Sequence, residues 1–170
     1  AARIPSVYAE SSNGRVAPRF YIRGLGNTDF DLAASQPVSV IMDNVVMENV
    51  ILKSFPLFDV AQVEVARGPQ GTLFGRNTTA GTIKFDSVRP TQDTDGYVSL
   101  AVGSYGMTNL EAALGGALVE DVLSARLSVL SQRRDDWIDN GFTGENNALR
   151  GYDEQAGRAQ PLYTPTEAFE

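Results

Sequence analysis

The chain has 170 residues, of which 42% are hydrophobic, enough for a packed core and too many for global disorder. Its 14 Lys and Arg against 21 Asp and Glu leave a formal net charge of -7, which argues against a nucleic-acid-binding surface. The absence of Cys excludes disulfides and thiolate chemistry, and the absence of His removes the commonest general base and transition-metal ligand. We therefore expect no metal, no cofactor and no catalytic residue.

The sequence contains no helix suited to a membrane. No segment approaches the ~18 consecutive apolar residues that a membrane-spanning helix needs. The first ten residues also lack the charged segment and apolar run of a signal peptide. Any membrane contact of this chain would therefore have to be made by β-strands, whose signal in a sequence is weaker.

Residues 1–90 mix short strands with short helical turns, which is typical of a small α+β domain with a mixed sheet. Strands are predicted at 19–23, 38–42, 45–50, 63–67 and 81–85, and one or two helical turns at 57–62. Asp43 and Asn44 separate two apolar runs, and both residue types tolerate the left-handed conformation of a tight hairpin. The other predicted structural turns, where a strand meets a glycine that can adopt positive φ, are at Gly24, Gly68, Pro69, Gly75 and Gly81.

Residues 91–96 are polar and rich in turn formers, so they are predicted to form a linker. After them, apolar and polar side chains alternate with a period of two, which indicates antiparallel strands. Strands are predicted near 98–102, 109–118, 123–132 and 155–163, with Pro161 removing one ladder donor from the last. Tight turns at 105–106 and 120–121 alternate with a long polar connection at 134–154.

The two faces of these strands differ in composition. One is largely aliphatic, and Leu114 and Leu127 lie at its centre, so we expect them to contact lipid. The other is built of small and charged residues, and Ser128 is expected to point to that side. The predicted strands are longer than the usual ~5–6 residues, although the alternation alone also fits a soluble antiparallel meander.

Four blocks of residues carry a resemblance to a known family. They are the sequences FYIRG at 20–24, VIMDNV at 40–45, VEVARGPQGTLFG at 63–75 and NTTAGTI at 77–83. In this order and spacing they resemble the plug domain of TonB-dependent outer-membrane receptors. Asn44 departs from that pattern, where the family usually has Gly, and so do Lys84 and Asp86 in the last strand.

The resemblance implies a particular fold, and it implies that the chain is a fragment of a larger protein. It implies an α+β plug domain over residues 1–90, lacking its N-terminal part, and a linker at 91–96. Residues 97–170 would then be the first ~4 strands of an antiparallel transmembrane β-barrel, fewer than the ~8 that bacterial barrels need to close. The chain is thus expected to be a fragment of a larger protein with no transport activity of its own.

The resemblance also implies contact residues. Arg23, Glu64 and Arg67 would form a latch between the plug and the barrel wall, because arginine–carboxylate pairs are directional. The loops that face the extracellular pocket in relatives would contribute ligand contacts from Asp29, Phe30, Asp31, Gln36 and Phe55. Aromatic and polar loop residues suit a bulky ligand, but Phe30 and Phe55 could equally pack onto the plug itself.

The function implied is a receptor in the outer membrane of a Gram-negative bacterium. Its plug would gate the TonB-energised uptake of a scarce nutrient, such as an iron–siderophore complex, cobalamin or a glycan. The implied partners are the TonB complex, the rest of the barrel, outer-membrane lipid and a small-molecule ligand, with no nucleic acid. Two alternatives remain: a soluble ligand-binding α+β module with a β-meander, and a carboxylate-based hydrolase, which the lack of His makes weak.

Overall fold

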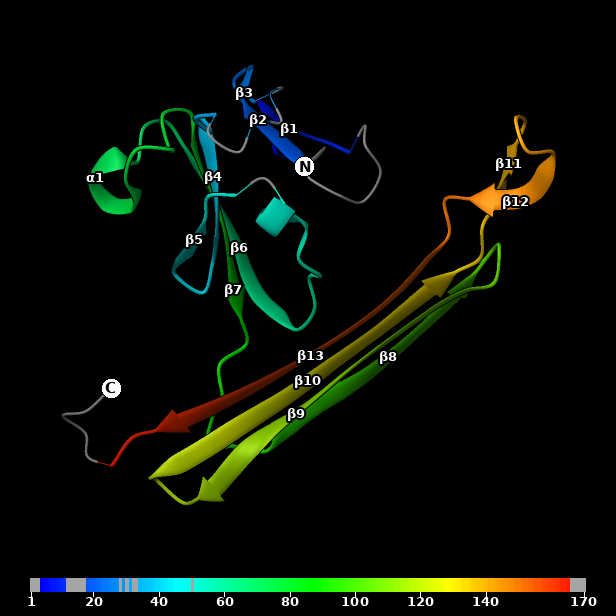
Figure 1. Cartoon of the computed structure of the whole chain (residues 1–170). Helices are drawn as coiled ribbons and strands as arrows, with labels where there is room; N and C mark the ends of the chain where they lie inside the picture. Colours follow the sequence, from blue (N-terminus) through cyan, green and yellow to red (C-terminus); the bar gives the residue numbers. More distant parts are fainter. Residues whose placement is uncertain are drawn as a thin grey trace. The chain divides into compact units, whose positions relative to one another are not determined.

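The structure is a computed structural model that describes residues 4–11, 18–27, 29, 31, 34–49 and 51–165. The chain divides into two compact units, unit 1 from Ala1 to Ser87 and unit 2 from Val88 to Glu170 (Figure 1). Among the described residues, no helix has the length and apolar character needed to cross a membrane. The predicted ligand residue Phe30 lies outside the described residues.

The described residues of unit 1 form two small sheets. The first is antiparallel and has the order β1 (Val7–Glu10), β2 (Arg19–Ile22) and β3 (Leu25–Gly26). The turn between β2 and β3 has positive φ at both central residues, 53° at Arg23 and 80° at Gly24. Glycine adopts this conformation at no steric cost, so Gly24 suits its position in this turn.

The second sheet has four strands in the order β5-β4-β7-β6. Its strands are β4 (Val38–Met42), β5 (Val45–Met47), β6 (Val60–Arg67) and β7 (Gly81–Ser87). The pairing of β4 with β7 is parallel and the other two pairings are antiparallel, so the predicted mixed sheet is confirmed. The predicted hairpin is also present, with φ of 47° at Asp43 and 69° at Asn44.

The helices of unit 1 do not lie where they were predicted. In the described part of the unit they are a 3-10 helix, η1 (Ile51–Ser54), and one turn of α-helix, α1 (Gly71–Phe74). The prediction of helical turns at 57–62 is wrong, because residues from Val60 onward belong to β6. There they pair with the end of β7 through an irregularity between Val60 and Gln62, so tertiary strand pairing overrides the local preference.

The core of unit 1 lies between its two sheets. Val7 and Ile22 come from the first sheet, and Val38, Val40, Ile83 and Phe85 from the second, together with Ala80. Ile22 and Val40 have no exposed surface. Strand β1, which contributes Val7, was not predicted from the sequence. The core therefore joins segments from both ends of unit 1.

Unit 2 is an open antiparallel sheet in the order β13-β10-β9-β8. Its strands are β8 (Asp95–Gly103), β9 (Met107–Val119), β10 (Leu123–Arg134) and β13 (Tyr152–Tyr163). The four predicted antiparallel strands are confirmed, and β13, which contains Pro161, is an edge strand among the described residues. A separate hairpin of β11 (Ile138–Asn140) and β12 (Glu145–Leu149) occupies the long connection.

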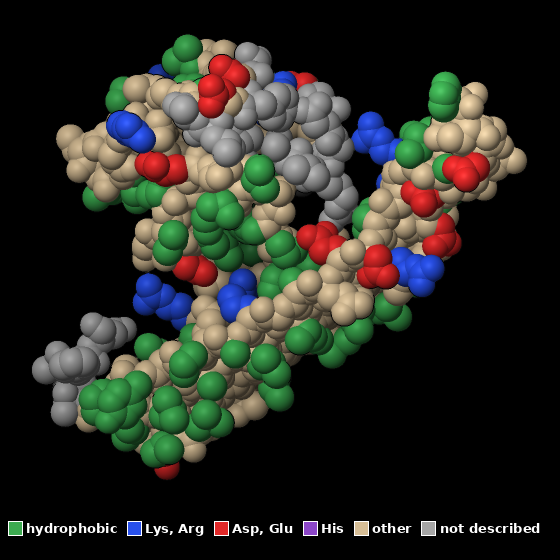
Figure 2. Space-filling model, in the orientation of Figure 1, with side chains coloured by type: hydrophobic (Ala, Val, Ile, Leu, Met, Phe, Trp, Pro, Cys, Tyr) green, Lys and Arg blue, Asp and Glu red, His purple; other side chains and the backbone are tan. Residues whose placement is uncertain are grey.

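The two faces of this sheet differ as the alternation predicted. Leu114 and Leu127 are cross-strand neighbours on one face and are 65% and 58% exposed. Val98, Leu100 and Val102 of β8 are exposed as well, and hydrophobic side chains gather along the sheet in Figure 2. On the opposite face, Arg126, Ser128 and Leu130 are buried.

An ion pair on the polar face explains why β8 starts earlier than predicted. Asp95 and Arg126 occupy one row across the sheet, with Gly115 of β9 between them. The Nη1 atom of Arg126 lies 3.0 Å from both carboxylate oxygens of Asp95. A Cβ on Gly115 would lie 3.2 Å from that Nη1 atom, so the missing side chain lets the arginine cross the strand. Asp95 and Gly96 therefore belong to β8, although the sequence predicted them in the linker.

Candidate functional site

Two of the three predicted latch residues lie close together. The backbone N–H of Arg23 donates to the Ser6 carbonyl at 2.8 Å. The Nη1 atom of Arg67 donates to the carbonyl of Pro5 at 3.3 Å. Because Pro5 and Ser6 are consecutive, Arg23 and Arg67 flank the same segment at the start of β1. Both arginine side chains are exposed, so both guanidinium groups can reach a partner outside unit 1.

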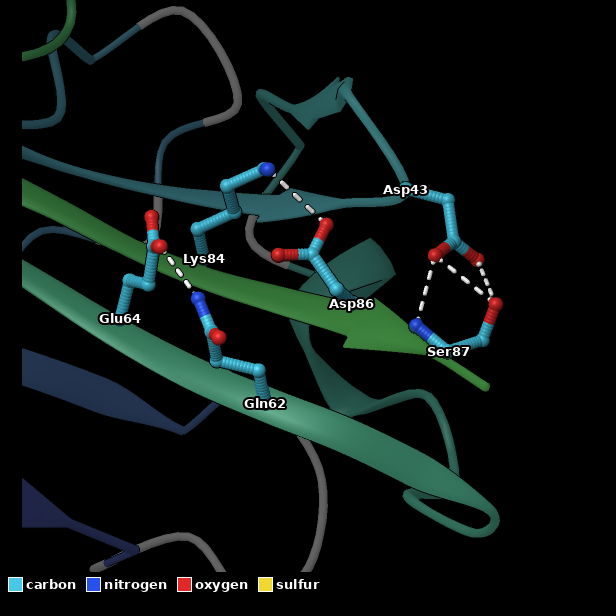
Figure 3. A network of polar contacts seen from close by, with 6 residues as sticks. All are labelled: Asp43, Gln62, Glu64, Lys84, Asp86 and Ser87. Atoms are coloured by element: carbon cyan, nitrogen blue, oxygen red, sulfur yellow. Dashed lines mark hydrogen bonds and ion pairs between the residues drawn. The ribbon is translucent and has the colours of Figure 1, made fainter. Parts of the chain in front are cut away.

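The third latch residue, Glu64, points elsewhere. It is three positions from Arg67 on β6, and alternate strand residues point to opposite faces. Glu64 accepts a hydrogen bond from Gln62 and is the cross-strand neighbour of Lys84 (Figure 3). Lys84 in turn pairs with Asp86, with Nζ and Oδ1 2.9 Å apart. The structure therefore places Glu64 in a polar network on β6 and β7 rather than beside the two arginines.

The turn residue Asp43 has a second role that the sequence did not reveal. Its Oδ1 atom accepts the backbone N–H of Ser87 at 2.7 Å, and the Ser87 hydroxyl lies within 2.9 Å of both carboxylate oxygens (Figure 3). Ser87 is the last residue of β7 and of unit 1. The carboxylate thus ties the β4–β5 turn to the end of the central strand. No local pattern predicts this contact, because the partners are 44 residues apart.

We expect Asp43→Ala to weaken this connection. Loss of a charge-assisted hydrogen bond typically costs about 1.5–3 kcal/mol. The opening free energy of the β7 amides, measured by hydrogen exchange, should fall by about that amount. Asp43→Asn is the matched control because asparagine tolerates positive φ and keeps an acceptor oxygen, so it should lose less. A loss in neither variant would show that the contact with Ser87 has little energetic weight, and equal losses in both would show that a neutral acceptor cannot replace the carboxylate.

The predicted ligand residues fall into two groups. Asp29 and Asp31 are exposed, and two side-chain-to-backbone hydrogen bonds link described residues here: Asn27 Oδ1 accepts from Asp29 N at 2.8 Å and Asp29 Oδ1 accepts from Asp31 N at 3.0 Å. Gln36 and Phe55 point inward. Gln36 is 6% exposed, and Phe55 packs edge-on against Phe85 with ring centroids 5.9 Å apart. Of the described candidates, only the two aspartates present their side chains to solvent.

Lys53 is a buried residue that the sequence reasoning missed. It lies in η1, is 7% exposed, and donates from Nζ to Gln36 Oε1 and to the Val38 carbonyl, both at 3.1 Å. Burial lowers the pKa of Lys53 to about 8. The sequence feature that could have revealed this burial is a single lysine that follows Ile51 and Leu52 and precedes Phe55. An apolar segment of this kind would otherwise be expected to bury its side chains.

The lowered pKa of Lys53 predicts that unit 1 becomes more stable at alkaline pH. The unfolded chain holds this proton up to an ordinary lysine pKa of 10.5, whereas the folded chain releases it near 8. Between these values the unfolded state binds more protons, so stability rises with pH, by about 3 kcal/mol in total. Denaturant melts at pH 7 and 10.5 should show this gain relative to Lys53→Met, which lacks the titrating group. A difference between the two proteins that stays constant with pH would contradict the assignment.

A cluster in unit 2 was also missed. The guanidinium of Arg134 lies 5.1 Å from the ring centroid of Tyr152 and 5.9 Å from that of Trp137. Trp137 in turn lies against Tyr105, with centroids 5.7 Å apart. The backbone N–H of Asp135 donates to the Tyr105 carbonyl at 2.9 Å, which holds the β8–β9 turn against the β10–β13 connection. Cation–π stacking of this kind orders the loop and gathers three aromatic rings.

The fold and these contacts define a class: a small α+β domain followed by a long-stranded antiparallel sheet with one aliphatic face. Residues 1–82 match the family described as the TonB-dependent Receptor Plug Domain. The chain is 32% identical over 91 residues to the pesticin receptor of Yersinia pestis, and 26% identical over 131 residues to the catecholate siderophore receptor Fiu of Escherichia coli. These matches cover 54% and 75% of this chain.

The solved structures agree with the sequence matches. The ferric yersiniabactin uptake receptor FyuA from Yersinia pestis superposes on 97% of this chain with a TM-score of 0.86 and 26% identity. The copper transporter OprC superposes on 98% of it with a TM-score of 0.72 and 18% identity, which shows a shared fold. Residues 1–82 thus match the plug-domain family, and the chain is homologous to the pesticin receptor, Fiu and FyuA, all TonB-dependent outer-membrane receptors.

The chain spans only part of these relatives. It covers 14% of the length of the pesticin receptor, 15% of Fiu and 26% of the FyuA chain. The matched family is one of transport receptors. This match argues against the alternative of a soluble α+β module with a β-meander. Unit 1 carries the plug domain, and unit 2 carries strands equivalent to barrel strands of these receptors.

Proposed function

We propose that the intact protein is a transport receptor, not an enzyme, and takes up an iron–siderophore complex across the outer membrane. The observation that supports this most is the agreement with FyuA, a ferric yersiniabactin uptake receptor, over nearly the whole chain. The match to Fiu, a catecholate siderophore receptor, favours the same ligand class over cobalamin or a glycan. Unit 1 is the plug, and the aliphatic face of unit 2 contacts lipid.

Uptake requires that the plug move or partly unfold when the TonB complex acts on it. Motions of this kind use the parts of a protein with low local stability. In unit 1 the buried core joins both sheets, so we expect movement to begin outside this core, at exposed segments. Asp29 and Asp31 are the proposed ligand contacts of unit 1.

A growth experiment tests the ligand class. A strain that lacks the full-length gene is grown under iron limitation with one purified ferric siderophore at a time, and then with the gene restored. Growth and uptake of radioactive iron that depend on the gene for at least one siderophore support the proposal. Uptake of cobalamin or a glycan, with no siderophore transported at normal receptor levels, would replace iron with another ligand.

We expect Arg67→Ala in the full-length receptor to loosen the plug while the barrel still inserts. Arg67 is exposed beside Arg23, so a carboxylate on the barrel wall can pair with both arginines. The readout is entry of an antibiotic that is too large for ordinary porins, which should increase in Arg67→Ala.

Glu64, in the polar network on β6 and β7, provides a matched control for the Arg67→Ala prediction. Glu64→Gln alters an exposed residue of the same strand that points to the other face of β6. If both Glu64 and Arg67 belong to the latch, both variants will raise permeability. If only the arginines do, Glu64→Gln will behave like the wild type. Unchanged permeability in Arg67→Ala, at normal receptor levels, would remove Arg67 from the latch.

A further inference from the structure

Three connecting segments of unit 1 meet at one end of its second sheet. Strands β4 and β7 are parallel and both start at this end, where their first residues pair with each other. The segment before β4, residues 34–37, therefore lies beside the segment before β7, residues 68–80, which contains α1. The Ala80 N–H donates to the Pro37 carbonyl at 2.8 Å and extends this pairing by one step. Helix η1 follows β5, which runs back along β4 toward the same end.

Gln36 joins its segment to both of the others. Its Oε1 atom accepts a hydrogen bond from Lys53 Nζ of η1 at 3.1 Å, and its backbone N–H donates to Asn77 Oδ1 at 3.3 Å. The hydroxyl of Ser35 donates to the same Asn77 oxygen at 3.2 Å, and the hydroxyl of Ser39 donates to the Asn77 carbonyl at 2.8 Å. The positions of the two amide oxygens are fixed, because a lysine ammonium and a backbone N–H can only donate. Gln36, Lys53 and Asn77 together form the Gln36 network.

The Gln36 network is buried, whereas the helices that it holds are largely exposed. Gln36, Lys53 and Asn77 are 6%, 7% and 7% exposed. Lys53 is the buried residue of η1, and its neighbours Ile51 and Leu52 are more than half exposed. All four residues of α1 are at least partly exposed. Both helices therefore depend for their position on buried polar contacts rather than on apolar burial of their own side chains.

The Gln36 network also connects to Asp31, a proposed ligand contact. The Ala34 N–H donates to the Asp31 carbonyl at 3.0 Å, and residue 36 follows two positions later. On the α1 side, the Thr78 carbonyl accepts the Gln70 N–H at 3.1 Å, which closes the α1 segment one position after the network. Hydrogen bonds and short stretches of chain thus run without a gap from Asp31 to α1.

We propose that the Gln36 network couples Asp31 to η1 and α1, so that the three segments open and close as one cooperative unit. A buried polar network is worth more than the sum of its pairs, because each group that stays behind after one contact breaks lacks a partner. A ligand that fixes Asp31 therefore stabilises η1 and α1 without touching either helix. The inference rests on the proposed function for the identity of that ligand alone.

Hydrogen exchange of the full-length receptor without ligand tests the coupling. The Phe74 and Leu52 amides are both hydrogen-bonded, so their exchange reports the opening of α1 and η1. Asn77→Ala removes the acceptor of the Gln36 N–H and should speed exchange at Phe74 and, across the network, at Leu52. Gln36→Leu removes the acceptor of Lys53 and should speed exchange at the same two amides. The expected increase is roughly tenfold in each case, the factor that corresponds to about 1.4 kcal/mol.

Asp43→Ala is the matched control, because it removes a polar contact at the opposite end of the same sheet. It should speed exchange at the end of β7 and leave Leu52 and Phe74 unchanged. If it speeds exchange at all of these amides equally, unit 1 opens as a whole and the proposal is wrong. If Asn77→Ala affects Phe74 alone and Gln36→Leu affects Leu52 alone, the segments open independently, which also overturns the proposal.

Addition of ligand separates the coupling from the ligand class. The ferric siderophore that supports growth is added to the receptor, and the wild type should gain protection at Ala34, Leu52 and Phe74 together. Asn77→Ala should keep the gain at Ala34 and lose it at Phe74. A gain confined to Ala34 in the wild type would contradict the coupling. If no siderophore supports growth, the ligand class is wrong, and the exchange rates measured without ligand still decide whether the three segments open together.

Discussion

Replacement of Leu127 by arginine is expected to impair assembly of the receptor in the outer membrane. Leu127 lies at the centre of the aliphatic face of unit 2 beside Leu114, and both are largely exposed. An arginine on the lipid face of a barrel costs about 2–4 kcal/mol near the bilayer midplane. The measurement is the fraction of full-length receptor in outer-membrane vesicles that resists unfolding by detergent at room temperature.

The control for Leu127→Arg must place the same charge on the other face. Ser128 was predicted to point there, and it does, but it is fully buried with Ala113 and Arg158 as cross-strand neighbours. An arginine at Ser128 would overpack the site and confuse charge with volume. Ser99 is the better control, because it is exposed on the polar face and pairs with Glu111 across the strand. If Ser99→Arg and Leu127→Arg assemble equally well, the lipid-facing assignment is wrong.

Gly81→Ala is expected to disrupt unit 1 far more than Gly71→Ala. Gly81 has a φ of 147°, a conformation that residues with a side chain rarely adopt, at a typical cost of about 1–3 kcal/mol. An added Cβ would lie 2.2 Å from the Ala66 carbonyl oxygen and 2.9 Å from Ile22 Cδ1. The Ala66 backbone lies on one side and the core residue Ile22 on the other, so a methyl group has no room. Overpacking of this kind adds about 1–3 kcal/mol to the loss of stability.

The effect of Gly81→Ala is measured as hydrogen-exchange protection of β6 and β7 in the full-length receptor. Protection should fall sharply, because Gly81 pairs with Arg67 at the end of β6 and with Val38 at the start of β4. Gly71→Ala is the control: an added Cβ there meets only the hydroxyl oxygen of Thr78, at 3.9 Å, and no backbone atom. Equal protection in the two variants would show that the close approach at Gly81 has little energetic weight.

The glycine and turn residues are features that the local sequence was able to predict. The positive φ values at Gly24, Asp43, Asn44, Gly68, Gly75 and Gly81 agree with their prediction as turn or strand-end positions. Turn chemistry is local, since few residue types tolerate positive φ, so a single sequence reveals it. The helical turns predicted at 57–62 failed because β7 supplies a pairing partner for β6 that no local window contains.

The candidate site was harder to predict from the sequence. The latch residues were chosen as a group, yet Glu64 lies on the opposite face of β6 from Arg67, beside Gln62 and Lys84. The ligand residues were chosen as loop positions, yet Gln36 and Phe55 pack inward against Lys53 and Phe85. A residue's position in a loop does not determine its direction, because burial depends on contacts with distant segments.

By itself, the sequence determined the class of protein, the mixed sheet, and the long antiparallel strands with their two faces. Strand periodicity and turn residues act over a few positions, and four motif blocks in order identified the plug. Only the tertiary structure decided that Asp43 holds Ser87, that Gly115 lets Arg126 reach Asp95, and that Lys53 is buried against Gln36. These contacts join residues 17 to 44 positions apart. Their energies come from burial and charge, which exist only once the chain has folded.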